Sequence, residues 1–212
     1  AQALKAPRLE TITGKGHFVI THALPGISPS LELLEDLVAA DLKTSRPFTL
    51  DPPAPLDFDN WWLDASQVAL LQHMYRDQAR YTQCLEQLGL WSGEACTCTP
   101  YLPEIGNRPR PGDILAWSES ACVVFANSVL GARTNRNGAI MDLISNIVGK
   151  TPFCGLLTDA GRRATRRITV DTKDLPLPQI LGAALGRLIL GEVPYIFGLD
   201  RWLGQKLTPD VC

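Results

Sequence analysis

Two closely spaced cysteines are the first groups in this sequence that suggest chemistry. Cys96 and Cys98 are separated by a single residue. This pair is a weak metal signal by itself, because structural zinc usually needs a second pair at matched spacing and the sequence has none. The histidines are scattered, at His17, His22 and His73. The spacing alone therefore favours two free core thiols, with metal ligation as the alternative.

Polar side chains set among apolar residues follow the cysteines, between residues 113 and 138. A buried polar atom without a partner costs about 1–3 kcal/mol, so these groups must satisfy one another or bind a polar ligand. Arg133 and Arg136 lie close together here, and guanidinium groups present a fork of donors that suits a carboxylate or phosphate. We expect both arginines to face one polar cleft with Glu119 and Asn127. An internal network that pins a loop is the alternative.

Helices and short apolar strands alternate along the chain. The expected strands cover residues 17–21, 46–50, 114–117, 155–157, 168–170 and 193–198. The expected helices cover residues 29–41, 65–88, 140–148 and 180–190, the second ended by Gly89. An apolar segment at residues 122–127 follows the third strand closely. This alternation predicts a layered α/β fold.

The composition narrows the class of protein. The 212 residues are 45 % hydrophobic and 20 % charged, with a net charge of −2, which is typical of a globular domain. The near-neutral charge does not indicate a partner among nucleic acids or membrane headgroups. The longest apolar stretch, residues 180–193, is too short and too interrupted to span a bilayer. We predict no nucleic-acid partner and no membrane partner.

The cysteines and the first residue bear on location. Six cysteines would allow disulfides, but this chain is long enough to form its own core and shows no export signal, so reduced thiols and a cytoplasmic location are expected. The first residue is Ala1 rather than Met, and we interpret it as a cut end.

Three long motifs resemble one family. Residues 97–102 (Thr-Cys-Thr-Pro-Tyr-Leu), 116–121 (Ala-Trp-Ser-Glu-Ser-Ala) and 126–138 (Ala-Asn-Ser-Val-Leu-Gly-Ala-Arg-Thr-Asn-Arg-Asn-Gly) resemble the aconitase X family in order and separation. Residues 149–156, 185–187 and 193–199 resemble later blocks of the family. The upstream match is weaker, at residues 16–17, 30–31, 47–51 and 57–61.

The resemblance implies an aconitase-like layered α/β domain, incomplete here, with residues 1–212 as the N-terminal part of the catalytic large-subunit domain. Family members are hydro-lyases, such as phosphomevalonate dehydratase and cis-3-hydroxy-L-proline dehydratase. It also implies an iron–sulfur cluster or a mononuclear iron, which acts as a Lewis acid on a leaving hydroxyl. The implied partners are a small anionic or zwitterionic hydroxy-acid and a small domain or subunit that carries a serine base.

Carried over residue by residue, the resemblance makes Cys98 the first iron-ligating cysteine. The family's other iron-ligating cysteines lie in later blocks, so we expect this fragment alone to hold no cofactor and to be inactive. We predict substrate-binding roles for residues in the matched segments: His17, Thr49, Asp51, Asp57, Ser120, Asn127, Ser128, Arg133, Asn135 and Arg136.

Some positions depart from the family pattern. Phe48 and Asp51 differ from the family's Pro-Thr-Thr-x-Asn loop, and the Asp51 carboxylate would repel an anionic substrate. Asn137 stands where the family has an acidic residue. Two other readings stay open: a non-catalytic aconitase X-like protein without a cluster, and a zinc or redox module built on Cys96 and Cys98.

Overall fold

The centre of the molecule is a small array of parallel segments. The computed structural model describes residues 2, 4–19, 26, 28–53, 62–91 and 95–203. Strand β2 (His17–Phe18) pairs in parallel with β3 (Thr49–Leu50), with His17 opposite Thr49. Single parallel bridges add a segment on each side, from His17 to Trp117 and from Leu50 to Cys96. Four stretches of chain therefore run in the same direction side by side.

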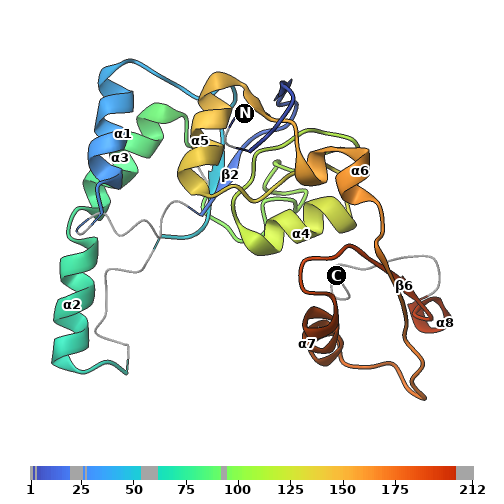
Figure 1. Cartoon of the computed structure of the whole chain (residues 1–212). Helices are drawn as coiled ribbons and strands as arrows, with labels where there is room; N and C mark the ends of the chain where they lie inside the picture. The colour runs from blue at the N-terminus through green and yellow to red at the C-terminus, as the bar shows by residue number, and fades with distance from the viewer. Residues whose placement is uncertain are drawn as a thin grey trace.

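The hydrophobic core packs on this array beneath three helices, α1 (Ser30–Ala39), α3 (Gln78–Leu88) and α5 (Ala139–Val148). Figure 1 shows α1 and α3 side by side, with α5 between them and β2. The buried side chains are Phe18, Leu31, Leu34, Phe48, Leu50, Tyr81, Cys84, Leu85, Leu88 and Leu143. Their burial anchors β2 and β3, the two strands that lead into the polar site.

A second, smaller core lies under α4 (Ser120–Ser128). Trp117 and Leu115 pack there against Cys122, Val123 and Ala126. This helix contains the apolar segment 122–127, whose sequence alone does not decide between helix and strand. Its one buried face fixes the rotation of the helix and so the direction of its first turn.

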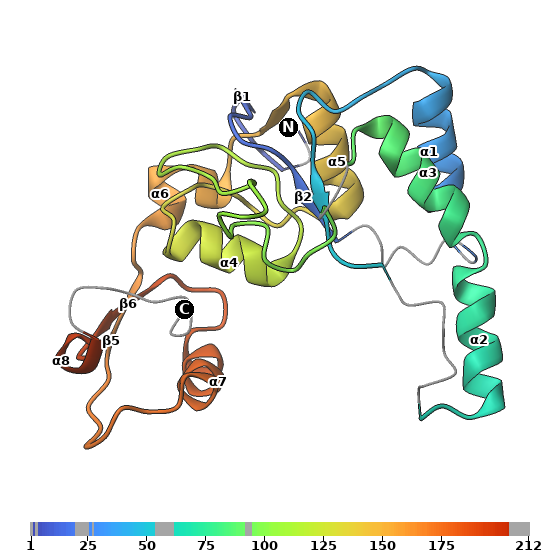
Figure 2. The same ribbon diagram turned by 180° about the vertical axis from the view of Figure 1, so that it is seen from behind.

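One long helix over residues 65–88 was predicted, and this prediction is wrong. The structure has α2 (Ala65–Tyr75) and α3, separated by Arg76 and Asp77. No residue of α2 is buried, whereas α3 buries five. The apolar stripe of the first half, with Val68, Leu71 and Tyr75, is only half-buried, so the packing seen among the described residues does not hold the two helices in line. Figure 2 shows α2 extending away from the core.

Other elements agree with the predictions to within a few residues. α5, β5 (Arg166–Thr169), α7 (Pro178–Ile189) and β6 (Pro194–Phe197) lie where expected, and Gly89 ends α3 with a left-handed φ of 119°. α1 begins at Ser30 rather than at Pro29, and the Ser28 hydroxyl accepts a hydrogen bond from the Ser30 N–H.

Two predicted strands are wrong. Residues 155–157 form a 3₁₀ turn, η2 (Gly155–Leu157), because Gly155 is left-handed and the Asn135 side chain accepts a hydrogen bond from the Leu156 N–H. Helix α6 (Asp159–Arg162) follows this turn. Residues 114–117 make only single bridges, from Ile114 to Arg133 and from Trp117 to His17.

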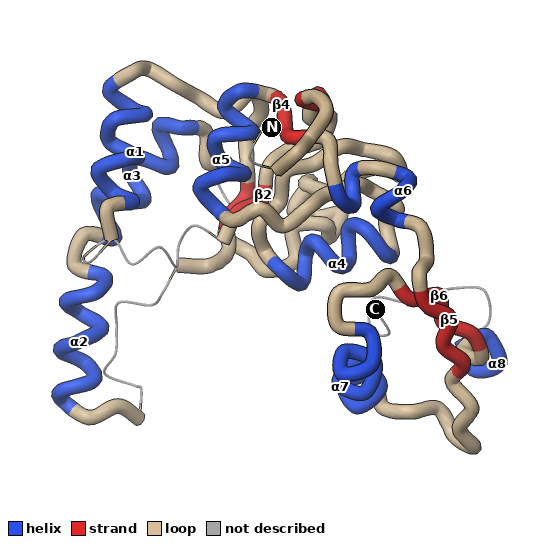
Figure 3. The backbone as a smooth tube through the Cα atoms, viewed as in Figure 1, coloured by secondary structure: helices blue, strands red, loops and turns tan. Residues whose placement is uncertain are grey.

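The remaining elements frame this body. Strand β1 (Leu9–Thr11) pairs antiparallel with β4 (Lys150–Pro152). β5 and β6 form a separate parallel pair, followed by α8 (Asp200–Leu203), and Figure 3 shows this pair with α7 to one side of the main body. No helix among the described residues has the length and apolar character needed to cross a membrane.

Candidate functional site

The carboxyl ends of the parallel segments meet at one edge of the array. Asp51 follows β3, Cys98 lies two residues after the Cys96 bridge, and Glu119 lies two residues after the Trp117 bridge. In α/β proteins ligands bind outside the carboxyl ends of parallel strands, because side chains from neighbouring strands converge there. The topology therefore collects groups far apart in sequence into one polar site.

His17 forms the floor of the site and is completely buried. Its Nδ1 lies 2.9 Å from the Thr49 hydroxyl, and its Nε2 lies 2.6 Å from a Glu119 carboxylate oxygen. The Asn107 amide donates to the Thr49 hydroxyl at 2.8 Å and to the Gly16 carbonyl at 2.9 Å. Both ring nitrogens are thus engaged, and the imidazole is fixed in orientation.

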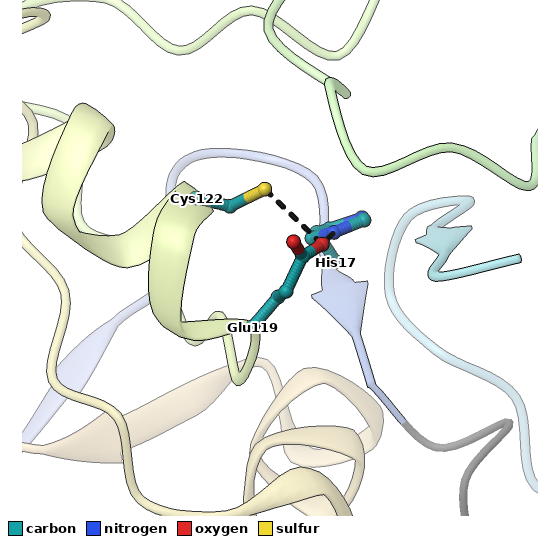
Figure 4. Close-up of side chains that lie close together, drawn as sticks. All are labelled: His17, Glu119 and Cys122. Carbon is teal, nitrogen blue, oxygen red and sulfur yellow. Dashed lines mark hydrogen bonds and ion pairs between the residues drawn. The ribbon is translucent and has the colours of Figure 1, made fainter. Parts of the chain in front are cut away.

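Glu119 and Cys122 come from the start of α4. Glu119 is the N-cap residue and Cys122 lies three positions later, which puts both on one side of the first turn. The Cys122 thiol donates to the Glu119 carboxylate at 3.2 Å and contacts the Cys98 carbonyl oxygen at 3.2 Å. Figure 4 shows the His17 ring and the Cys122 thiol converging on the Glu119 carboxylate. Burial, followed by the Glu119 charge, raises the pKa of the Cys122 thiol.

Cys98 lies on the outer side of the same carboxylate. Its thiol donates to Asp51 at 3.1 Å. That hydrogen bond, with burial and the charges of Asp51 and Glu119, raises the pKa of Cys98 to about 11. The thiol is therefore protonated at neutral pH unless a cation replaces its proton.

Among the described residues, two sets of potential metal ligands share Glu119. One is His17, Glu119 and Cys122, and the other is Asp51, Cys98 and Glu119. Within each set the ligand atoms lie within 4.8 Å of one another. Nitrogen, oxygen and sulfur donors so close together suit a transition metal such as zinc or iron.

Comparison with known proteins identifies the family of this chain. A family model described as "Aconitase X first domain" matches residues 1–160. The chain belongs to the aconitase X family. It is 35 % identical over 187 residues to the phosphomevalonate dehydratase large subunit of Methanocaldococcus jannaschii, covering 85 % of this chain and 43 % of that protein.

Two further comparisons agree. The chain is 39 % identical over 110 residues to the cis-3-hydroxy-L-proline dehydratase of Pseudomonas aeruginosa, covering 50 % of this chain and 18 % of that protein. The crystal structure of Thermococcus kodakaraensis aconitase X (holo-form) superposes with a TM-score of 0.69 at 32 % identity, over 92 % of this chain and 46 % of that chain. These relatives confirm the α/β fold, and their names place the family among the hydro-lyases.

The match covers only part of the length of these relatives. This chain spans less than half the length of the phosphomevalonate dehydratase large subunit from Methanocaldococcus jannaschii and of the solved aconitase X chain.

The structure gathers half of the residues predicted from the aconitase X motifs. His17, Thr49 and Asp51 line the site beside Cys98. Ser120 lies on the first turn of α4 and accepts a 2.6 Å hydrogen bond from the Arg136 guanidinium. Asp57 lies outside the described residues.

Asn127 lies at the last turn of α4, at the opposite end of the helix from Glu119. Its amide nitrogen donates to the carbonyls of Val123 and Thr134, each at 2.9 Å. Its oxygen accepts from the Thr134 N–H and, at 2.6 Å, from the Arg162 guanidinium. This side chain joins the loop that follows α4 to α6.

Arg133, Asn135 and Ser128 also make contacts away from Glu119. Arg133 donates to the Leu157 carbonyl at 2.9 Å and pairs with Asp159 at 2.5 Å. Asn135 donates to the Cys154 carbonyl, and the Ser128 hydroxyl donates back to the carbonyl at the preceding helical turn. The prediction that Glu119, Asn127, Arg133 and Arg136 face one cleft is therefore wrong. Arg136 contacts the first turn of α4, where Glu119 lies, whereas Asn127 and Arg133 contact α6.

Sequence reasoning missed Cys122 and Asn107 as members of the site. The spacing Glu119-x-x-Cys122 is a usable signal once a helix is known to begin at Ser120. Asn107 lies in the loop between the two nearby motifs, and nothing in its sequence context points to Thr49.

Proposed function

We propose that this chain is the N-terminal part, residues 1–212, of the large-subunit domain of an aconitase X dehydratase. It would act on a small hydroxy-acid of the kind named for its relatives, phosphomevalonate or cis-3-hydroxyproline. The observation that carries the proposal is the Cys98 thiol at the carboxyl edge of the parallel array, with Asp51 and Glu119 beside it. A small domain or subunit would complete the site.

The donor set fits an iron centre with Cys98 as its thiolate ligand. An iron or iron–sulfur centre supplies a Lewis acid that polarises the leaving hydroxyl of the substrate. One thiolate is too few for a cluster, which normally takes three or four protein ligands, so further ligands would come from beyond this chain. Asp51 accepts a hydrogen bond from the Cys98 thiol, and the thiol proton would leave to solvent when a metal ion binds the thiolate.

The chain's own residues also give the site its charge and shape. The Arg136 guanidinium and the Ser120 hydroxyl lie at the first turn of α4, next to Glu119, and can orient a substrate carboxylate or phosphate. His17 and Cys122 hold the Glu119 carboxylate from beneath and leave its other side toward Cys98. The Asp51 carboxylate beside Cys98 favours a zwitterionic substrate over a purely anionic one.

One observation favours the alternative of a non-catalytic aconitase X-like protein. Asp51 stands where the family motif has a neutral amide, and its hydrogen bond and charge keep Cys98 protonated. Such a thiol binds iron less readily than a free thiolate, because the proton must be displaced.

The test uses the complete protein with its small subunit. Cys98→Ser is expected to abolish the iron-associated absorbance and turnover of phosphomevalonate and cis-3-hydroxyproline. Cys96→Ser is the matched control and should keep most of both, because the Cys96 thiol lies outside both ligand sets. Loss with Cys96→Ser and retention with Cys98→Ser would contradict the proposal. An unsubstituted protein without iron or turnover would support the non-catalytic alternative.

We also predict that the purified 212-residue chain has no measurable dehydratase activity. The reason is the single iron-ligating thiolate carried over from the family and the absence of a small-domain base from these residues. The measurement is turnover of both substrates after incubation with iron and sulfide under anaerobic conditions. Measurable turnover by this chain alone would show that its own residues supply both functions.

A further inference from the structure

The deepest side chains of the site form a donor set that does not involve Cys98. His17 and Cys122 are completely buried, and the Glu119 side chain is 12 % exposed. Nε2, a carboxylate oxygen and Sγ lie within 4.8 Å of one another. A buried imidazole, carboxylate and thiol are costly to hold together unless protons or a cation link them.

The hydrogen bonds around His17 are compatible with two tautomers, one that shares a proton with Glu119 and one that leaves Nε2 free to bind a cation. In one arrangement the Thr49 hydroxyl donates to Nδ1, and Nε2–H donates to Glu119. In the other, Nδ1–H donates to the Thr49 hydroxyl, which turns its own proton to the Gly16 carbonyl at 3.5 Å. The second arrangement frees the Nε2 lone pair and gives the ring the outer hydrogen bond that metal-bound histidines usually make.

Rigid elements hold all three donors. His17 lies on β2, bridged to Trp117 on one side and paired with Thr49 on the other, and its ring packs edge-on against the Trp117 ring at 5.5 Å between centroids. Glu119 and Cys122 lie on a helical turn whose inner face is part of the second core. A ligand set on strands and helices is positioned more precisely than one on loops.

We infer that His17 Nε2, the Glu119 carboxylate and Cys122 Sγ form a binding site for one divalent transition-metal ion within this chain alone. A three-ligand set of nitrogen, oxygen and sulfur suits zinc, cobalt or ferrous iron, with an open fourth position. Binding would release the Cys122 thiol proton to solvent, and the charge of the metal ion would offset the burial and the Glu119 charge that raise the pKa of this thiol. His17 would change tautomer and stay neutral. This inference does not use Cys98 and does not rest on the proposed dehydratase activity, although both ligand sets contain Glu119.

The geometry requires a small adjustment. Zinc takes nitrogen and oxygen at about 2.0–2.2 Å and sulfur at about 2.3 Å, so tetrahedral ligands lie roughly 3.3–3.6 Å apart. The sulfur–oxygen contact of 3.2 Å is already close to this, and the nitrogen–oxygen contact of 2.6 Å must lengthen. Rotation of the Glu119 side chain lengthens that contact, because both of these contacts are made to Oε2. The His17 Nε2 and Cys122 Sγ atoms lie within 4.8 Å of each other, and side-chain rotation of Cys122 would bring them to the separation that tetrahedral ligands need.

The second ligand set is the competing site, and the two differ in their thiol. Both contain Glu119, but one uses Cys122 with a buried imidazole, and the other uses Cys98 with the Asp51 carboxylate. Only the first offers nitrogen, and nitrogen with sulfur is the combination that zinc and cobalt prefer over oxygen-rich sites. We therefore assign the ion to the Cys122 set.

Cobalt titration of the purified, reduced 212-residue chain tests the assignment. Cobalt is the probe because a bound thiolate gives a near-ultraviolet charge-transfer band and tetrahedral binding gives visible d–d bands. We expect saturation at one ion per chain. Cys122→Ser should weaken binding at least tenfold and remove the charge-transfer band, whereas Cys98→Ser should keep both, as should the distant control Cys154→Ser.

X-ray absorption of the zinc-loaded, unsubstituted chain gives a readout that needs no variant. One sulfur at about 2.3 Å together with imidazole scattering is expected. Absence of sulfur or of imidazole would overturn the inference, as would loss of the cobalt band in Cys98→Ser with its retention in Cys122→Ser. Circular dichroism and thermal unfolding of each variant separate loss of the site from loss of the fold.

Discussion

Glu119 belongs to both ligand sets of the site, the buried set with His17 and Cys122 and the outer set with Asp51 and Cys98. It receives hydrogen bonds from His17 and Cys122 on the buried side and shares a ligand set with Asp51 and Cys98 on the other. A change in charge at this carboxylate is therefore felt by both thiols, and its charge raises the pKa of each. Substitutions at Glu119 are expected to change both ligand sets at once. Substitutions of Cys98 and Cys122 each change only one set, so they distinguish the two better.

Asp142 is a second buried carboxyl group, on α5 and apart from the site. It accepts hydrogen bonds from the backbone N–H and the side-chain amide of Asn137. Asn137 stands where the family motif has an acidic residue, and its contact with Asp142 gives a physical reason for the amide. A second carboxyl group at this position would place two like charges together in a buried place.

We predict that Asp142 makes the folded chain less stable as pH rises. Burial raises its pKa from 3.8 to about 7, with the Asn137 hydrogen bonds opposing the rise. Between these values the folded state binds more proton than the unfolded state, so the free energy of unfolding falls with increasing pH, by up to about 4 kcal/mol in total. Asp142→Asn should flatten this slope in urea unfolding measured from about pH 4.5 to pH 7.5.

The control for this prediction is Asp174→Asn, which changes an exposed carboxyl group. Its unfolding free energy should follow that of the unsubstituted chain across the pH range. If Asp142→Asn retains the full pH dependence, the titrating group lies elsewhere.

At the scale of elements, left-handed glycines end helices and place the loops of the site. Gly89 ends α3 at a φ of 119°. Its N–H donates to the carbonyls of Leu85 and Glu86. A Cβ added there would lie 2.5 Å from the Thr44 hydroxyl oxygen. The residue is thus constrained both by its backbone conformation and by a close neighbour, and it sets the path of the chain toward Phe48 and β3.

We predict that Gly89→Ala destabilises the chain by about 2 kcal/mol or more, because strain at positive φ adds to a steric conflict. Gly112 is the matched control, since it has a φ of 83° but nothing within 4 Å of an added Cβ. Gly112→Ala should therefore cost only about 1 kcal/mol. Urea unfolding of both variants measures the difference, and equal losses would show that the contact with Thr44 is relieved at no cost.

For the whole molecule, local patterns predicted the elements better than the site. α5 and α7 were predictable because their apolar residues follow a helical period. The break at Arg76 and Asp77 was not, since it depends on whether α2 finds a surface to pack on. The contact between His17 and Glu119 joins residues 102 positions apart, and only the parallel pairing brings them together.

The family motifs point to Cys98 and to the two arginines as site residues, but they do not predict which elements each arginine contacts. Arg133 and Arg136 are three residues apart in sequence, yet one contacts α6 and its preceding turn and the other contacts the first turn of α4. Cys122 could not be recognised as a ligand candidate without the start of α4. Such partners are fixed by packing, which a single sequence does not display.

The molecule also divides into a packed body and a thinly packed end. β5, α7 and β6 form a strand–helix–strand unit with parallel strands, which in other α/β proteins is covered on both faces. Here α7 has no buried residue, whereas α3 and α5 bury five and four. Several large apolar side chains of the unit are exposed: Leu175, Leu177, Ile180, Leu188, Leu190, Tyr195 and Ile196.

We predict that backbone amides of α7 in this 212-residue chain exchange with deuterium at least about a hundredfold faster than those of α3 and α5. Local opening costs little free energy where few apolar contacts are lost, and it approaches the global unfolding free energy in a well-packed core. Hydrogen exchange followed by mass spectrometry measures this peptide by peptide, with residues 178–189 compared with residues 78–88 and 139–148. The comparison is internal, so it does not depend on the stability of the preparation. Equal protection of the three helices would mean that the exposed apolar face of α7 is covered in solution, and the oligomeric state measured by light scattering would then show whether a second copy covers it.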